Sequence, residues 1–201
     1  MSSQKPFKFL LKSIEIILEM LRDRKIVINT VIDSNLLKKK IRSNDLNFEF
    51  YKNDGSKIKV IYFLNRVKPS TVKNTIEYEY SNNLDSNDEI IFITKETLPQ
   101  TISKLIDNYY TDKNYFIQIF NIANLQFNIT KHNFVPKHEL LDNDTANNII
   151  TKYNLTSRFH LPHILKKDPI AMYYGMKNGD ICKITRKSET AGMYISYRCC
   201  R

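Results

Sequence analysis

Histidine and cysteine side chains are the first candidates for chemistry in this sequence, because they bind metals and act as nucleophiles. The nearest pairs are six, three and one position apart: His132 and His138, His160 and His163, Cys199 and Cys200. Zinc sites use four ligands at characteristic spacings, and these pairs fit no such pattern. We therefore expect no metal site. The histidines are interpreted as surface or hydrogen-bonded side chains, and Cys182 and Cys199 as small apolar residues on neighbouring strands.

Nucleotide and hydrolytic chemistry also find little support in the residue pattern. Four glycines in the whole chain cannot supply a phosphate-binding loop, so no nucleotide cofactor is expected. Ser188 lies outside any nucleophile-elbow pattern. Glu77 and Glu79 are the closest carboxylate pair, but alternate residues of a helix point to different faces. A metal-dependent nuclease needs converging carboxylates, so we expect no catalytic residues.

One polar cluster remains, formed by Ser188, Glu189 and Thr190 between Arg186 and Arg198. It has two interpretations. The hydroxyls and the carboxylate could satisfy their own turn and a nearby arginine. Alternatively, the cluster is a polar surface that docks on another protein.

The elements around this cluster can be read from turn and capping residues. Asp168 is a typical helix N-cap, Pro169 suits the first helical position, and Gly175 suits the left-handed residue after the last turn. Strands are predicted at 181–187 and 193–200, joined by a turn at 188–192. The C-terminal part is therefore expected to end in a β-hairpin.

The rest of the chain alternates between helical and strand patterns. Predicted strands lie at 47–51, 57–64, 89–94, 115–120 and 125–131, the first two joined around Asp54-Gly55. Predicted helices lie at 7–21, after a Ser70 cap, from about Pro99, and after an Asp142 cap, with Tyr153 among the buried residues of the last. The helix at 7–21 could pack on a core or lie on a membrane, and its mixed charges favour the core. We predict an α/β domain at 1–128 and a small α+β domain at 129–201, giving an α/β (α+β overall) protein.

Charge and composition bound the function classes. The net charge of +10 over 201 residues suits nucleic acid or an acidic protein partner. Lys38, Lys39, Lys40 and Arg42 cluster on a helix predicted after Asp33-Ser34. Without interleaved aromatic residues, that cluster is either a solvated face or a phosphate contact. We found no apolar run that could span a bilayer, no signal-peptide pattern and an odd number of cysteines, so we expect an intracellular protein without a membrane partner.

Several short sequence segments of the C-terminal part occur in an order and spacing typical of one family. They are HNFVPKH (132–138), LPHI (161–164), DPIAMYYG (168–175), NGDICKITRKSETAG (178–192) and YISYR (194–198). Together they resemble the C-terminal assembly domain of the fifth subunit of eukaryotic RNA polymerases, whose archaeal counterpart is essentially this domain alone.

The resemblance implies a non-catalytic subunit of a DNA-directed RNA polymerase, not a homo-oligomer. It implies a nuclease-like α/β jaw domain near downstream duplex DNA, and an assembly domain that docks on the largest subunit beside a small shared subunit. It implies that the partner-binding positions are His132, Pro136, His138, Leu161, Pro162, Asp168, Pro169, Tyr173, Gly175, Arg186, Ser188, Glu189, Thr190, Tyr197 and Arg198. Lys38, Lys39, Lys40 and Arg42 are the candidate DNA-facing residues.

Location and source stay open at this point. The abundance of Asn, Ile and Lys suggests an AT-rich genome, either of a eukaryote or of a large DNA virus with its own polymerase. The expected location is the nucleus if the chain is cellular, and the virion or the infected-cell cytoplasm if it is viral. A stand-alone nucleic-acid-binding protein is the alternative function, and an orphan nuclease is a third.

Overall fold

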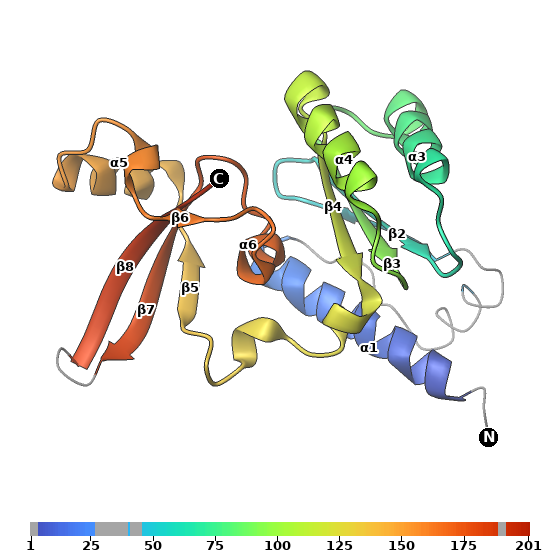
Figure 1. Ribbon diagram of the computed structural model, residues 1–201, viewed down its shortest axis with the longest axis horizontal. Coiled ribbons are helices and arrows are strands. Elements are labelled where there is room, and N and C mark those ends of the chain that lie inside the picture. Colours follow the sequence, from blue (N-terminus) through green and yellow to red (C-terminus); the bar gives the residue numbers. More distant parts are fainter. Residues whose placement is uncertain (1–3, 27–39, 41–45, 189–191) are drawn as a thin grey trace. The chain divides into compact units, whose positions relative to one another are not determined.

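The computed structural model describes residues 4–26, 40, 46–188 and 192–201. The chain divides into two compact units, Met1–Phe127 and Asn128–Arg201. This division lies one residue from the boundary expected between 128 and 129. Figure 1 shows the elements of both units, and each unit is described by itself below.

The N-terminal unit is built on a four-stranded mixed sheet. Its strands are β1 (Asn47–Tyr51), β2 (Lys57–Phe63), β3 (Glu89–Thr94) and β4 (Phe116–Asn121), in the order β1-β2-β3-β4. The β1–β2 pair is the predicted antiparallel hairpin, whereas β2, β3 and β4 run parallel. All six residues of β3 are buried. This burial explains the unbroken apolar run at 90–93, because a central parallel strand is covered on both faces.

Helices cover both faces of that sheet (Figure 1). The helices α3 (Pro69–Asn82) and α4 (Gln100–Lys113) pack on one face, over a core that includes Val72, Ile76, Phe92 and Ile102. The helix α1 (Gln4–Asp23) lies on the other face, where the Ser13 hydroxyl is 3.3 Å from the Tyr62 hydroxyl. The apolar stripe of α1 is buried, so the core interpretation of this helix is confirmed. The α/β alternation of this unit is likewise confirmed.

Two local predictions in this region are wrong. The helix α3 begins at Pro69 with Lys68 as its N-cap, so Ser70 lies inside the helix and does not cap it. Proline is suited to the first turn, where its missing N–H needs no partner. The segment 125–131 contains the 3₁₀ helices η1 (Ile122–Leu125) and η2 (Ile129–Lys131) and no strand.

The cause of this second error is local hydrogen bonding. The side-chain oxygens of Asn121 and Asn128 accept hydrogen bonds from the backbone N–H groups of Ala123 and Thr130. Such bonds compete with strand formation by satisfying backbone donors locally.

The C-terminal unit is a second four-stranded sheet. Its strands are β5 (Lys137–Leu140), β7 (Ile181–Ser188), β8 (Gly192–Cys200) and β6 (His163–Ile164), in the order β5-β7-β8-β6. β7 and β8 form the predicted antiparallel hairpin, and β5 was not predicted. Helix α5 (Asn143–Lys152), 3₁₀ helix η3 (Arg158–His160) and helix α6 (Pro169–Tyr174) complete the unit.

Two small cores lie on opposite faces of this sheet. Ile181 and Cys199 pack with Ala146 of α5 on one face, whereas Cys182 and Cys200 pack with Ala171 of α6 on the other. Cys182 and Cys199 do lie on neighbouring strands, and all three cysteines are buried. The adjacent residues Cys199 and Cys200 therefore belong to different cores, because side chains alternate along a strand.

Capping in this unit follows the sequence closely. Asp142 and Asp168 accept hydrogen bonds from the N–H groups of Thr145 and Ile170, each at 2.8 Å. Gly175 ends α6 in the left-handed region, with φ of 64°. Tyr153 is exposed, however, so its predicted burial is wrong. It is the C-cap of α5 and follows the last residue of the helix.

Candidate partner-binding groove

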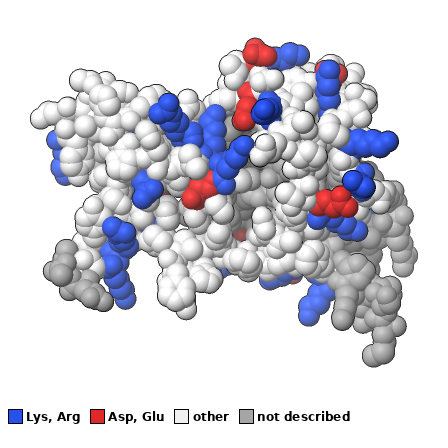
Figure 2. Space-filling view, in the orientation of Figure 1, with Lys and Arg blue, Asp and Glu red and all other residues white. Residues whose placement is uncertain are grey.

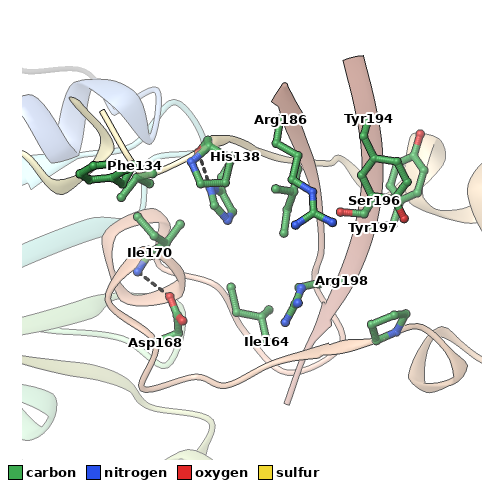
Figure 3. Close-up of a pocket in the computed structure, with 14 residues that line it drawn as sticks. Phe134, His138, Ile164, Asp168, Ile170, Arg186, Tyr194, Ser196, Tyr197 and Arg198 are labelled. Atoms are coloured by element: carbon green, nitrogen blue, oxygen red, sulfur yellow. Dashed lines mark hydrogen bonds between the residues drawn. The ribbon is translucent and has the colours of Figure 1, made fainter. Parts of the chain in front are cut away.

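A groove of about 430 Å³ lies on the α6 face of the C-terminal sheet (Figure 3). Ile164, Ile170 and Ile184 are its buried apolar residues. The polar residues that line it are His138, Asp168, Arg186, Ser196 and Arg198. We call this surface the groove; the remaining residues that line it are Phe134, Val135, Pro136, Pro162, Tyr194 and Tyr197.

The pairing of β7 with β8 positions the groove's long wall. Ile184 is directly opposite Ser196, and Arg186 is directly opposite Tyr194. Alternation along each strand directs this set toward one face of the sheet. His138 joins it from β5, where it is the register partner of Ile184. A single face therefore carries apolar, aromatic and basic side chains together.

Two guanidinium groups give the groove its positive charge. Arg186 is exposed, and its guanidinium carbon lies 4.9 Å from the centre of the Tyr194 ring. Arg198 donates a hydrogen bond of 3.0 Å to the backbone carbonyl of His163. Both groups are held by neighbours that are uncharged or aromatic. Neither of these contacts neutralises the positive charge of its arginine.

Among the described residues, Asp168 is the one carboxylate that lines the groove, and it already has a structural role. Its Oδ1 accepts the N–H of Ile170 at the start of α6 (Figure 3). His138 is also fixed by the backbone, since its Nδ1 lies 2.7 Å from the carbonyl oxygen of Pro136. A carbonyl oxygen only accepts, so the proton of a neutral His138 sits on Nδ1.

Phe134 stands at the rim of the groove with 91% of its surface exposed. The His132 ring lies 5.7 Å from it, and His132 Nδ1 accepts the Phe134 N–H at 3.3 Å. A phenylalanine exposed to this degree beside a basic groove is typical of a surface that another protein covers.

The structure brings seven of the predicted partner-binding residues together in this groove. They are Pro136, His138, Pro162, Asp168, Arg186, Tyr197 and Arg198. Sequence reasoning missed the other described residues that line the groove, although all of them lie within the segments that carried the resemblance: Phe134, Val135, Ile164, Ile170, Ile184, Tyr194 and Ser196. Alternation across from Arg186 is the signal that could have identified Tyr194 and Ser196.

Other predicted residues lie outside the groove: His132, Leu161, Pro169, Tyr173, Gly175 and Ser188. Tyr173 is buried, and its hydroxyl accepts a hydrogen bond of 2.9 Å from Asn128 Nδ2. Its role in the unit is thus internal packing. Glu189 and Thr190 lie outside the described residues, so the two interpretations of the Ser188–Thr190 cluster stay as they were.

The basic run of the N-terminal unit is described at Lys40 alone, and Lys38, Lys39 and Arg42 lie outside the described residues, as does the cap predicted at Asp33-Ser34. Lys40 Nζ donates to the backbone carbonyl of Asn47 at 2.7 Å and lies 5.1 Å from the Phe48 ring centre. This lysine is thus partly engaged by its own domain.

The carboxylates of α3 have partners within the N-terminal unit. Glu77 accepts the Tyr109 hydroxyl at 3.0 Å, and Glu79 is 2.7 Å from Lys59 Nζ. Within the described part of the chain, no group of three His, Cys, Asp or Glu side chains gathers as a metal site would require. None of the helices described is long and apolar enough to cross a membrane.

Comparison with known proteins places the groove in a family. Residues 127–200 match the family "RNA polymerase Rpb5, C-terminal domain". The matched range is less than half of the chain, and over this range the chain is similar to the Rpb5 C-terminal domain. The matched range includes every described residue that lines the groove.

The proteins that this chain is similar to carry polymerase names. The chain is 45% identical over 89 residues to the DNA-directed RNA polymerases I, II, and III subunit rpabc1 of Dictyostelium discoideum, covering 44% of this chain and 45% of that protein. It is 40% identical over 84 residues to subunit RPABC1 of Caenorhabditis briggsae, covering 42% and 39%. It is 34% identical over 83 residues to the DNA-directed RNA polymerases IV and V subunit 5B of Arabidopsis thaliana, covering 41% and 38%. These matches span less than half the length of each relative.

Proposed function

We propose that this chain is a non-catalytic subunit of a multisubunit DNA-directed RNA polymerase and that its groove docks on the largest subunit. The observation that carries the proposal is the coincidence of the family match with the groove. Residues 127–200 match the Rpb5 C-terminal domain, and seven residues chosen from the family resemblance line one surface. The names of the relatives support membership of a polymerase.

The chemistry of the groove suits a protein surface with acidic side chains. Ile164, Ile170 and Ile184 offer a floor to apolar anchors, and Arg186 and Arg198 offer charge-assisted hydrogen bonds to carboxylates. Aromatic and arginine side chains are enriched in the energetic centres of protein interfaces. Docking by this groove needs no chemical step, so the chain contributes assembly while the large subunits supply catalysis.

The rest of the proposal follows the family resemblance. The N-terminal unit forms part of the lower jaw near downstream duplex DNA, and the C-terminal unit adjoins a small shared subunit. The net charge of +10 supports a position near nucleic acid. A cellular chain then works in the nucleus, and a viral one in the virion or in the infected-cell cytoplasm.

Affinity purification from the native cell tests this function. The tagged full chain should recover the polymerase large subunits, and deletion of residues 168–201, which removes α6, β7 and β8, should abolish recovery. Arg186→Glu reverses a charge in the groove and should lower recovery roughly tenfold, the equivalent of about 1.4 kcal/mol. Lys152→Glu changes an exposed residue at the end of α5, outside the groove; it is the matched control and should recover polymerase normally.

Two outcomes would contradict the proposal at different levels. Recovery of the tagged chain alone, from a lysate that contains intact polymerase, would show that the chain is not a polymerase subunit. Equal recovery of polymerase by Arg186→Glu and Lys152→Glu would be compatible with a polymerase subunit, but it would show that the groove is not the docking surface.

The high positive charge favours one alternative, a stand-alone nucleic-acid-binding protein. Such a protein would bind duplex DNA without partners, with an affinity that falls steeply with salt. As a polymerase subunit, the purified chain should bind duplex DNA no more tightly than non-specific proteins, with Kd of about 10⁻⁴–10⁻⁶ M at physiological salt. Fluorescence anisotropy across a salt series measures both quantities.

A further inference from the structure

In the part of the chain that the structure describes, the outer edge of β8 has a partner strand at its C-terminal end only. β8 runs from Gly192 to Cys200, and β6 pairs only with Cys199 and Cys200. Among the residues that the structure describes, no other strand pairs with β8 on the side away from β7. Residues 193–197 therefore form an open strand edge, which presents backbone N–H and C=O groups to another chain.

Hydrogen bonds at the end of β8 show which backbone groups face this edge. The N–H of Cys200 donates to Asp180 on the β7 side, whereas the N–H of Cys199 donates to Pro162 on the β6 side. In an antiparallel pair this direction alternates from residue to residue. The residues whose N–H and C=O face the open edge are therefore Met193, Ile195 and Tyr197. Those that pair with β7 are Tyr194, Ser196 and Arg198.

Side chains on one face of this edge are apolar and exposed. Met193 is 60% exposed and Ile195 is 46% exposed, and half-buried Tyr197 lies on the same face. Native proteins usually protect an open strand edge with charge, proline or a covering segment. An exposed apolar edge of this length indicates a surface that another chain covers.

The opposite face and the flanking strand are basic. Arg198 lies on β8, and Arg186 lies across from Tyr194 on β7. Lys187, the register partner of Met193, adds a further exposed charge. Figure 2 shows Lys and Arg side chains along the outer part of this hairpin, on the face in view. Two such hairpins placed edge to edge would repel each other, so charge favours an acidic partner over a second copy of this chain.

We propose that an extended segment of another polymerase subunit adds as a strand to the edge of β8. Its apolar side chains lie over Met193 and Ile195, and its carboxylates on the alternate positions face Arg186 and Arg198. Backbone hydrogen bonds to residues 193, 195 and 197 supply the pairing, and the side chains supply specificity. This inference rests on the proposed function, and it names the chemistry of the partner segment and its mode of binding.

Hydrogen exchange at single-residue resolution gives this proposal a specific signature. The full chain is compared alone and within the purified polymerase. The amides of Ile195 and Tyr197 face the edge, and they should exchange at least about tenfold more slowly in the complex. The amides of Tyr194, Ser196 and Arg198 pair with β7 and should be slow in both states. Unchanged exchange at residues 195 and 197 in a complex that contains the chain would overturn strand addition.

Two variants at position 195 distinguish the contribution of the backbone N–H to binding from that of the side chain. Ile195→Pro removes an N–H that β7 does not use, so the hairpin should survive, as edge strands tolerate proline. Ile195→Ala truncates the apolar side chain but keeps the N–H. Circular dichroism and urea unfolding confirm that each full-length variant is folded. We expect recovery of the polymerase large subunits to fall at least threefold further for Ile195→Pro than for Ile195→Ala.

The possible outcomes show separately whether strand addition fails or whether the proposed function fails. If the wild-type chain recovers no large subunit, the proposed function fails first. If the wild type recovers them and Ile195→Pro recovers as much as Ile195→Ala, strand addition alone fails. If the free chain is a dimer by light scattering, with slow exchange at residues 195 and 197, the occupant is a second copy and the proposal is wrong. If Ile195→Pro does not fold, the exchange of the wild-type amides decides.

Discussion

Arg186 and Tyr194 stand directly opposite each other on β7 and β8, with the guanidinium carbon 4.9 Å from the ring centre. The ring supports one side of the guanidinium, while the planar edge with its N–H donors is left for a ligand. This arrangement fixes an otherwise flexible side chain in the groove without neutralising its charge. It connects the register of the terminal hairpin to the chemistry that we propose for docking.

Removal of the ring should therefore affect binding more than folding. We predict that Tyr194→Ala lowers the free energy of unfolding by no more than about 1 kcal/mol, because an exposed cation–π contact contributes about that much. Recovery of the polymerase should fall severalfold, since Arg186 is no longer held in place. Tyr78→Ala, which truncates an exposed tyrosine of α3, is the control. Equal recovery by the two variants would show that Tyr194 plays no part in docking.

In the N-terminal unit, Lys59 forms ion pairs with two carboxylates. The two carboxylates should contribute differently to stability. Lys59 Nζ lies 2.7 Å from buried Glu79 and 3.2 Å from Glu49, which is exposed. Glu79→Ala leaves a buried ammonium without its main partner and should cost about 3 kcal/mol. Glu49→Ala should cost less than about 1 kcal/mol, because solvent screens that pair. Urea unfolding of both variants measures the difference, and equal losses would contradict this account of the pair.

Much of this fold could be predicted from the sequence where the determinants are local. The caps at Asp142 and Asp168, the end of α6 at Gly175 and the terminal hairpin each depend on residues within one turn. β5 escaped prediction because Lys137–Leu140 is short and shows no clear alternation, and it exists only through pairing with β7. Tyr153 was predicted to be buried because its spacing fits the helix, but its actual exposure depends on tertiary packing that the sequence does not show.

The candidate site was harder to predict than the fold. The family resemblance selected Arg186 and Arg198, but the sequence could not show that they line one groove with His138 and Phe134. That arrangement follows from two strand registers: β5 with β7, which pairs His138 with the distant Ile184, and β7 with β8, which pairs residues of one hairpin. The open edge of β8 depends on how short β6 is, and no residue pattern indicated its length.

The cysteines should be chemically inert in the folded protein. Burial raises the pKa of Cys182 and of Cys200 to about 11, and burial also raises the pKa of Cys199. At pH 8 the thiolate fraction of Cys182 and Cys200 is about one in a thousand, and the thiolate is the reactive form. We predict that Ellman's reagent labels no thiol of the native chain within minutes and three after unfolding in guanidinium. Rapid labelling of the native chain would contradict the buried positions.

The same pKa shifts predict the direction of an alkaline effect. A folded-state pKa above the unfolded value of about 9 means that the unfolded chain loses thiol protons first. The free energy of unfolding should therefore be independent of these thiols below pH 9 and should decrease between pH 9 and 11. The C200A variant should show a smaller decrease across this range than the wild type. Urea unfolding at pH 8, 9 and 10 tests the slope, and identical slopes would contradict the prediction.

The cap at Asp168 links α6 to the floor of the groove. Asp168→Ala removes the acceptor for the Ile170 N–H and should cost about 1 kcal/mol of unfolding free energy. Asp168→Asn keeps a side-chain oxygen that can accept the same hydrogen bond, so it should cost only about a few tenths of a kcal/mol of unfolding free energy. Because Ile170 lies in the groove, Asp168→Ala should also weaken polymerase recovery. A loss of recovery as large for Asp168→Asn as for Asp168→Ala would instead indicate a direct contact of the carboxylate with the partner.

The central claim is that this chain is a resident subunit of an RNA polymerase. The most direct test is to purify the polymerase from the native cell through a tag on its largest subunit and to determine its composition by native mass spectrometry. We predict one copy of this chain in each intact enzyme. An intact, active polymerase that lacks this chain and carries a different Rpb5 C-terminal domain in its place would contradict the claim.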